Sequence, residues 1–199
     1  MRDPPQGGYG AYVVQAEAAK SQWLMWLVHH YLFFQIPLLR PDRFLRATLP
    51  FVEWIFAKST AWIIGAIGLV GFYLTSRQWD TFTSTMLHFF TPRGFVLYVL
   101  CLVIVKVFHE LGHAYTATRY GCRVSTMGIA MVLMVPMLYS DTSDAWKLPS
   151  RRQRAAIGAA GMIVECSLAA LAIFAWNFLD DDVARSLAFI MATTSLALG

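Results

Sequence analysis

The chain has 199 residues, of which 57% are hydrophobic and 14% are charged, with a formal net charge of +4. Soluble domains carry about a quarter charged residues, so this composition and a mean hydropathy of +0.51 exclude an ordinary soluble domain and indicate an integral membrane protein. The small positive charge includes no long basic run, which argues against a nucleic-acid-binding protein. The three cysteines show no Cys-x-x-Cys spacing, so we expect neither a disulfide framework nor a thiolate zinc cluster.

The N-terminal part of the chain divides into two predicted regions. Residues 1–20 begin with prolines and glycines and are predicted to be a loose segment, without the apolar core of a cleavable signal peptide. Within residues 21–55, the aromatic stretch from Trp23 to Leu39 is short for a span and contains Pro37. This pattern predicts an interfacial helix or a cover over the membrane core. The stretch from Arg40 to Arg46 is predicted to be a basic loop.

Residues 56–199 are predicted to form a transmembrane core. Four apolar segments are expected to be membrane-crossing helices: about Phe56 to Thr75, Arg93 to Tyr120, Ala155 to Leu179, and a segment that starts near Ala184. In the first of them, small residues at positions 65, 68 and 71 would allow close packing of another helix. The mixed segment from Arg77 to Phe90 is amphipathic and is expected to lie along the outer surface.

The charges between these segments predict their orientation. Basic residues are concentrated before the first span and between the second and third, whereas three aspartates follow the third. The apolar piece from Thr126 to Leu138 is too short to cross, contains Pro136 and has basic loops on both sides, so we expect a re-entrant element. The sequence therefore predicts an all-α polytopic membrane protein, with about four transmembrane helices, this re-entrant element and an N-terminal interfacial helix. If the source is bacterial, the expected location is the cytoplasmic (inner) membrane.

The second predicted span carries the pattern His-Glu-x-x-His, at His109, Glu110 and His113. Histidines four residues apart share one face of a helix, so both imidazoles can bind one zinc ion. Glu110 lies about 100° around the helix from His109, close enough to take a proton from a water that zinc activates. Because unpaired ionisable groups are costly in lipid, a chance match is disfavoured, and we predict a site for Zn2+.

The motif and the start of the third span read HELGHAYTATRYG and SRRQRAAIGAAGM. These stretches resemble the site-2 protease family of intramembrane zinc metalloproteases. Two further stretches are similar to the family's bacterial peptide zinc metalloprotease branch, WLVHHYLFFQIPLLRPDRFL and PMLYSDTSDAWKLPSRRQR. The resemblance implies that His109 and His113 bind zinc, that Glu110 is catalytic, and that the substrates are membrane or exported peptides.

The family resemblance also implies a third zinc ligand, an aspartate in a motif of the type Asn-Pro-x-x-x-x-Asp-Gly, which this sequence lacks. The fourth apolar segment stops before that motif would appear, so we expect a fragment of a longer protein, with a naturally shortened, inactive chain as the alternative. Asp141 and Asp144 are candidate replacements, although loop capping is the favoured interpretation. Glu165, deep in the third span, could pair with Lys106 or face a polar cavity, whereas an i,i+4 pair of Lys106 with Glu110 is the plainer interpretation.

Two functions from different classes are compatible with these features. The first is a zinc-dependent metalloendopeptidase whose partners are the lipid bilayer and a peptide or membrane-protein substrate. The alternative is a catalytically inactive accessory or structural subunit of a larger membrane complex, which the missing third ligand favours. A zinc transporter is disfavoured, because the sequence contains a single intramembrane ligand cluster rather than several along a path.

Overall fold

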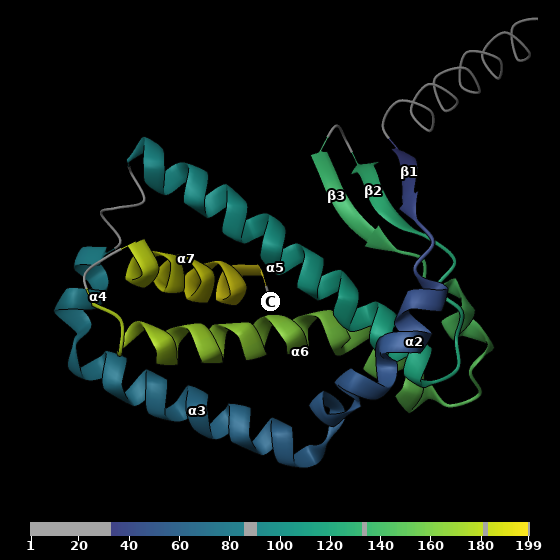
Figure 1. Cartoon of the computed structure of the whole chain (residues 1–199), viewed down its shortest axis with the longest axis horizontal. Coiled ribbons are helices and arrows are strands. Elements are labelled where there is room, and N and C mark those ends of the chain that lie inside the picture. Colours follow the sequence, from purple (N-terminus) through teal and green to yellow (C-terminus); the bar gives the residue numbers. More distant parts are fainter. Residues whose placement is uncertain (1–32, 86–90, 133–134, 181–182, 199) are drawn as a thin grey trace, which may run out of the picture. The chain divides into compact units, whose positions relative to one another are not determined.

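A computed structural model describes residues 33–85, 91–132, 135–180 and 183–198 (Figure 1). The chain separates into two compact units. One comprises the described part of Met1–Leu38 together with Gly128–Tyr139, and the other comprises Leu39–Met127 and Ser140–Gly199. The first unit is a small sheet and the second is helical. The predicted region boundaries at residues 20 and 55 stay predictions, and residues 1–20 lie outside the described part of the chain.

The helical unit contains three helices that are long and apolar enough to cross a membrane. These are α3 (Lys58–Arg77), α5 (Pro92–Arg119) and α6 (Arg151–Trp176), and a shorter apolar helix, α7 (Val183–Leu198), follows them. The ends of the three long helices differ from the predicted spans by at most four residues. The predicted class, an all-α polytopic membrane protein, is therefore confirmed as a mostly helical protein with membrane-spanning helices, to which a small sheet is added. The orientation of the spans in the membrane stays a prediction.

Shorter helical elements connect and cover the long ones. They are α2 (Asp42–Val52), η2 (Glu53–Phe56), α4 (Trp79–Thr85) and η4 (Ser143–Lys147). The predicted basic loop from Arg40 to Arg46 is wrong, because α2 begins at Asp42. Asp42 lies in the first turn, where it pairs with Arg46 at 3.1 Å, and Leu45 is fully buried. An acidic first turn, an i,i+4 ion pair and one buried leucine together favour the helix.

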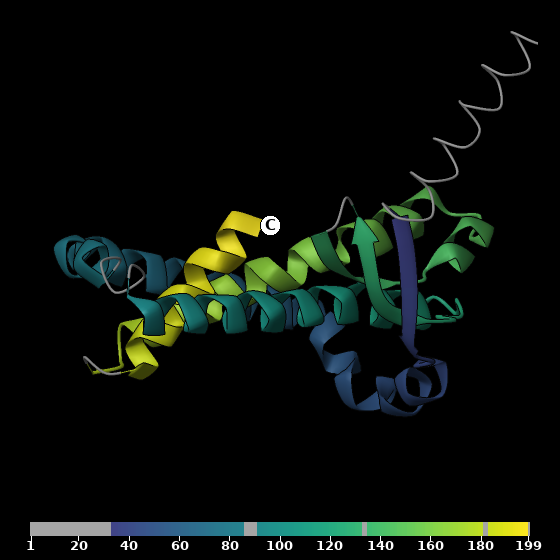
Figure 2. The same cartoon turned by 90° about the horizontal axis from the view of Figure 1, so that it is seen from above.

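Helix α6 packs against α3, α5 and α7, and Figures 1 and 2 show α7 beside both α5 and α6. Glycines allow the close approach of α3. A Cβ added at Gly68 would lie 2.9 Å from the Ala170 Cβ, and one at Gly71 would lie 2.9 Å from the Phe174 backbone. Nothing lies within 4 Å of a Cβ added at Gly65. Two of the three predicted packing positions, Gly68 and Gly71, are thus in the α3–α6 interface.

The outward faces of α3 and α5 are apolar. Large hydrophobic side chains are exposed along both helices, among them Trp62, Leu69, Phe72, Phe95, Val96 and Val103. In water such a surface would be a strong aggregation site, whereas in a bilayer lipid tails cover it without cost. The exposed apolar faces therefore agree with the predicted membrane environment.

The end of α5 that carries the motif is fixed by a buried hydrophobic cluster. The cluster joins α2, α5, the segment after α5 and α6, and its fully or nearly fully buried members are Leu45, Ala114, Ala117, Cys122, Val124 and Ile157. Thr48 on α2 also forms a hydrogen bond with the Tyr115 hydroxyl at 2.8 Å. Packing on three sides gives the second half of α5 a defined position, which a site built from several elements requires.

The other unit is a three-stranded sheet, which the sequence did not predict. Its strands are β1 (Phe33–Leu39), β2 (Met127–Val132) and β3 (Val135–Ser140), in the order β1-β2-β3. The predicted re-entrant piece is thus two strands, and the predicted interfacial helix is wrong over Phe33–Leu39, while residues 23–32 lie outside the described residues. Strand pairing satisfies the backbone groups of these short apolar segments, and Pro37 is tolerated because β1 is an edge strand.

Candidate metal centre

The two motif histidines face each other on α5. Their Nε2 atoms lie 3.1 Å apart, and their ring centroids are 4.7 Å apart in an edge-to-face arrangement. The four-residue spacing in a regular helix produces this juxtaposition. Both side chains are partly buried.

The hydrogen bond at the far side of His113 determines which ring nitrogen carries its proton. Nδ1 of His113 lies 2.6 Å from the carbonyl oxygen of Ile157 on α6. A carbonyl oxygen only accepts, so Nδ1 must donate, and in the neutral imidazole the Nε2 lone pair then points toward His109. Two ring nitrogens at 3.1 Å need a proton or a cation between them.

This donor set fits zinc. Neutral imidazole nitrogens are standard zinc ligands, and two such ligands of a tetrahedral ion lie about 3.4 Å apart. The observed separation of 3.1 Å is close to that value. Among the described residues, however, no group of three or more His, Cys, Asp or Glu side chains could hold a metal ion. The structure therefore brings two candidate ligands together.

The carboxylate of Glu110 is held by a residue that the sequence did not single out. Ser140, at the end of β3, donates its hydroxyl to Glu110 Oε2 at 2.6 Å. The serine is 30 residues from the glutamate in sequence. Its only local signal is that it is the first serine after the apolar stretch, which is too common a feature to predict a contact.

Lys106 and Glu165 also meet near the motif. Lys106 Nζ lies 2.8 Å from Glu165 Oε1, and the Glu165 side chain is fully buried. The same oxygen lies 3.0 Å from His109 Nδ1. The favoured interpretation of an i,i+4 pair between Lys106 and Glu110 is therefore wrong, because α6 offers a buried carboxylate that is a better partner than one on the same helix.

Small residues bring α5 and α6 together at this level. A Cβ added at Gly161 on α6 would lie 2.5 Å from the imidazole Cε1 of His109. A Cβ added at Gly112 on α5 would lie 3.0 Å from the Ala160 carbonyl oxygen. These positions have no room for a side chain, and the missing atoms are what allow His109 to lie directly against α6.

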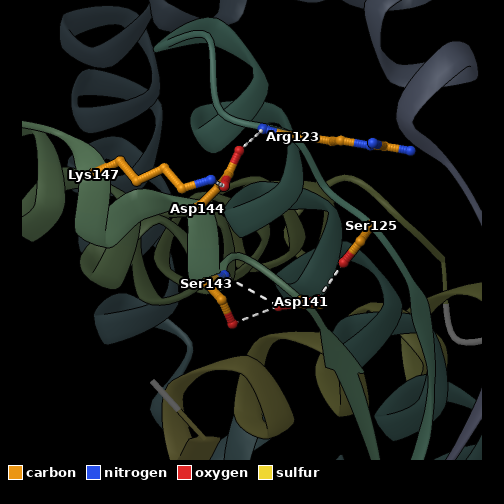
Figure 3. A network of polar contacts seen from close by, with 6 residues as sticks. All are labelled: Arg123, Ser125, Asp141, Ser143, Asp144 and Lys147. Atoms are coloured by element: carbon orange, nitrogen blue, oxygen red, sulfur yellow. Dashed lines mark hydrogen bonds and ion pairs between the residues drawn. The ribbon is translucent and has the colours of Figure 1, made fainter.

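Asp141 lies in the loop after β3, where it accepts hydrogen bonds from two serines (Figure 3). The Ser125 hydroxyl donates to Oδ2, and the Ser143 hydroxyl and backbone N–H donate to Oδ1 at 2.6 and 3.1 Å. These bonds, that from Ser125 first, hold the pKa of the Asp141 carboxyl below its usual value. The aspartate thus links the segment before β2 to the turn after β3.

Asp144 plays a similar part in the same loop (Figure 3). It accepts a hydrogen bond from the Arg123 backbone N–H at 3.1 Å and pairs with the Lys147 ammonium. The bond from Lys147 lowers the pKa of Asp144, and the same contact raises the pKa of Lys147. Within the described residues, neither Asp141 nor Asp144 joins the histidines in a group that could hold a metal. Their contacts support the loop-capping interpretation.

Comparison with known proteins agrees with the geometry on α5. Residues 97–197, just over half of the chain, match the model of Peptidase family M50. Neither the curated proteins nor the solved structures gave a match. The family match includes both motif histidines, Glu110, and the whole of α6. The bacterial branch suggested by the sequence stays a prediction. The chain therefore belongs to Peptidase family M50, a family of integral membrane zinc metalloproteases of the site-2 protease type.

Proposed function

We propose that this chain is a membrane-embedded zinc metallopeptidase that hydrolyses peptide bonds of membrane or exported peptides. The observation that carries the proposal is the facing pair of imidazoles, 3.1 Å apart, on the helix that also carries Glu110. Family membership supports the reaction class. The position of the motif in an apolar helix that is long enough to cross a bilayer supports a substrate that reaches the membrane.

In this proposal His109 and His113 hold the zinc ion through their Nε2 atoms. Bound Zn2+ supplies a Lewis acid that polarises a carbonyl group and makes water acidic enough to attack near neutral pH. The Ile157 carbonyl keeps the His113 imidazole in the tautomer that presents Nε2. The ring is thereby oriented before any ligand arrives, which reduces the cost of binding.

Glu110 acts as general base and then as general acid. Its Oε2 accepts the bond from Ser140 at 2.6 Å, so we assign the transferred proton to Oε1. Oε1 takes a proton from the attacking water and later gives it to the nitrogen of the leaving amine. The serine bond limits rotation of the carboxylate, which keeps Oε1 in one direction during both transfers.

The second candidate, an inactive accessory or structural subunit, is favoured by one observation. Within the described part of the chain, no third His, Cys, Asp or Glu side chain completes a metal-holding group with the histidine pair. Structural and catalytic zinc sites normally have three or four protein ligands. Such a subunit would keep the helical scaffold without hydrolysing peptides.

The two candidates differ in zinc content and activity, which can be measured on the purified full chain in proteoliposomes. We expect zinc in the wild-type protein and in Glu110→Gln, and its loss in His113→Ala. Cleavage of a library of apolar membrane-spanning peptides, read as new termini by mass spectrometry, should be abolished in both variants. Glu53→Gln, at an exposed glutamate of η2, is the matched control and should remain active. Zinc binding that His113→Ala leaves unchanged would refute the ligand assignment, and zinc binding without cleavage would favour the accessory subunit.

A further inference from the structure

Glu165 is a fully buried carboxylate in the middle of an apolar helix. Only one of its oxygens has partners among the described residues: Oε1 lies 2.8 Å from Lys106 Nζ and 3.0 Å from His109 Nδ1, whereas buried Oε2 has no hydrogen-bond partner. Carboxylates at this depth are costly, and in membrane helices they usually have a functional role. The ion pair with Lys106 alone does not explain Glu165, because two apolar residues would fill the same space at no loss of stability.

The position of Glu165 relative to the two histidines suggests why a carboxylate is present at this buried site. Nδ1 of His113 donates a hydrogen bond to the Ile157 carbonyl oxygen at 2.6 Å, and Nδ1 of His109 lies 3.0 Å from Glu165 Oε1. Gly161 lies between these two acceptors along α6, and His109 packs against it. Residues 157, 161 and 165 are each four apart, so they share one face of α6. One helix face therefore supplies an acceptor for each imidazole and the space between them.

We propose that Glu165 is a positioning residue of the zinc site: its carboxylate accepts a hydrogen bond from His109 Nδ1–H and so directs the Nε2 lone pair toward His113. The two atoms lie 3.0 Å apart, but His109 Nδ1 has no hydrogen-bond partner among the described residues, so the proposed bond requires a change in the orientation of the imidazole. Lys106 Nζ, 2.8 Å from the same oxygen, provides the counter-charge for the carboxylate. This inference rests on the proposed zinc site and adds the group that orients its first ligand.

Loss of a carboxylate that orients a metal-binding histidine lowers metal affinity by about 10- to 100-fold. A single substitution of Glu165 would leave Lys106 as an unpaired charge, and the protein could then fail to fold for that reason alone. Two double variants avoid this problem. Lys106→Met/Glu165→Leu removes both the charges and the acceptor, whereas Lys106→Met/Glu165→Gln removes the charges and keeps a neutral carbonyl acceptor.

The experiment measures zinc affinity of the detergent-solubilised full chain by competition with a chromophoric chelator. Lys106→Met/Glu165→Leu should bind zinc about 10- to 100-fold more weakly than wild type, and Lys106→Met/Glu165→Gln should recover part of that loss. Thermal unfolding should be similar in the two double variants, because both replace the ion pair with neutral residues. A merely structural role predicts the same zinc affinity in both, and this result would overturn the proposal.

A second readout does not need zinc. In zinc-free protein labelled with 15N-histidine, we expect the His109 signals, assigned with His109→Asn, to show a proton on Nδ1 in wild type, whether or not Nε2 also carries the proton that it shares with His113. This Nδ1 proton should be reduced in occupancy in Lys106→Met/Glu165→Leu. An unchanged occupancy of Nδ1 would contradict the inference, whereas His113-dependent zinc binding by the wild-type protein would still support the proposed function. A wild-type protein that binds no zinc would overturn the proposed function and this inference together.

Discussion

Substitution of Gly161 by alanine should weaken zinc binding while leaving the fold intact. The added Cβ would lie 2.5 Å from His109 Cε1 and 2.6 Å from His109 Cδ2, far inside van der Waals contact. The atoms that would have to move belong to the imidazole and not to a backbone segment. The helices can therefore keep their packing, and the displacement falls on the candidate zinc ligand.

The size of the effect follows from the cost of overpacking. Inserting one methyl group into a packed site costs about 1 to 3 kcal/mol when the surroundings cannot relax freely. If the zinc-free protein avoids this cost by rotating the His109 imidazole away, zinc binding must bring the imidazole back against the added methyl group. The zinc affinity then falls about 5- to 150-fold. Glu165 and His113 both contact the imidazole, which limits the alternative positions that could still reach the metal.

The assay compares Gly161→Ala with Gly158→Ala on the same helix, using chelator competition for zinc affinity and thermal unfolding in detergent for stability. Nothing lies within 4 Å of a Cβ added at Gly158, so this control should bind zinc like the wild-type protein. Gly161→Ala should unfold at nearly the wild-type temperature. If it also binds zinc as tightly as the wild type, the assignment of His109 as a ligand held against α6 is refuted.

Three further predictions concern neighbouring contacts. Ser140→Ala should lower the rate of peptide cleavage without changing zinc content, because it removes the hydrogen bond to Glu110 Oε2. A hydrogen bond to a carboxylate contributes about 1.5 to 3 kcal/mol. An unchanged cleavage rate would contradict the role of this bond. Gly71→Ala should lower the unfolding temperature in detergent by pressing a Cβ against the α6 backbone, and Gly65→Ala should not. Asp141→Asn should lower stability at pH 7. Because the folded-state pKa of Asp141 is lowered, the stabilisation by its carboxylate is present above about pH 3.9 and is lost as the pH falls through the folded-state pKa. The stability of Asp141→Asn should therefore fall less than that of the wild type between pH 7 and acid pH below about 3.9, as unfolding measured under both conditions would show.

Much of the helical architecture follows from local sequence. Apolar runs of about 20 residues with few charges have essentially one stable form in lipid, because a helix satisfies all of its backbone hydrogen bonds internally. The ends of α3, α5 and α6 were therefore predicted within a few residues. The facing of His109 and His113 is local as well, since a four-residue spacing places both on one side of any regular helix.

The sheet was missed for the opposite reason. A short apolar stretch with a proline is compatible with a re-entrant coil, a helix or a strand, and β1 pairs with β2 across more than eighty residues of sequence. Gly128 contacts the Ile36 carbonyl so closely that no Cβ would fit there. Only a partner strand distant in sequence makes such a contact possible, and nothing local signals it.

The sequence by itself determined that the chain lies in a membrane, where its long helices begin and end, and that two imidazoles and a carboxylate lie within one turn or so of each other. The tertiary structure decided what orients those groups. Ile157, Glu165 and Ser140 are 30 or more residues from their partners, and only the tertiary fold brings them into hydrogen-bond distance. The physical reason is that helix periodicity is a local property, whereas the partner of a buried polar group is chosen by whatever the fold packs against it.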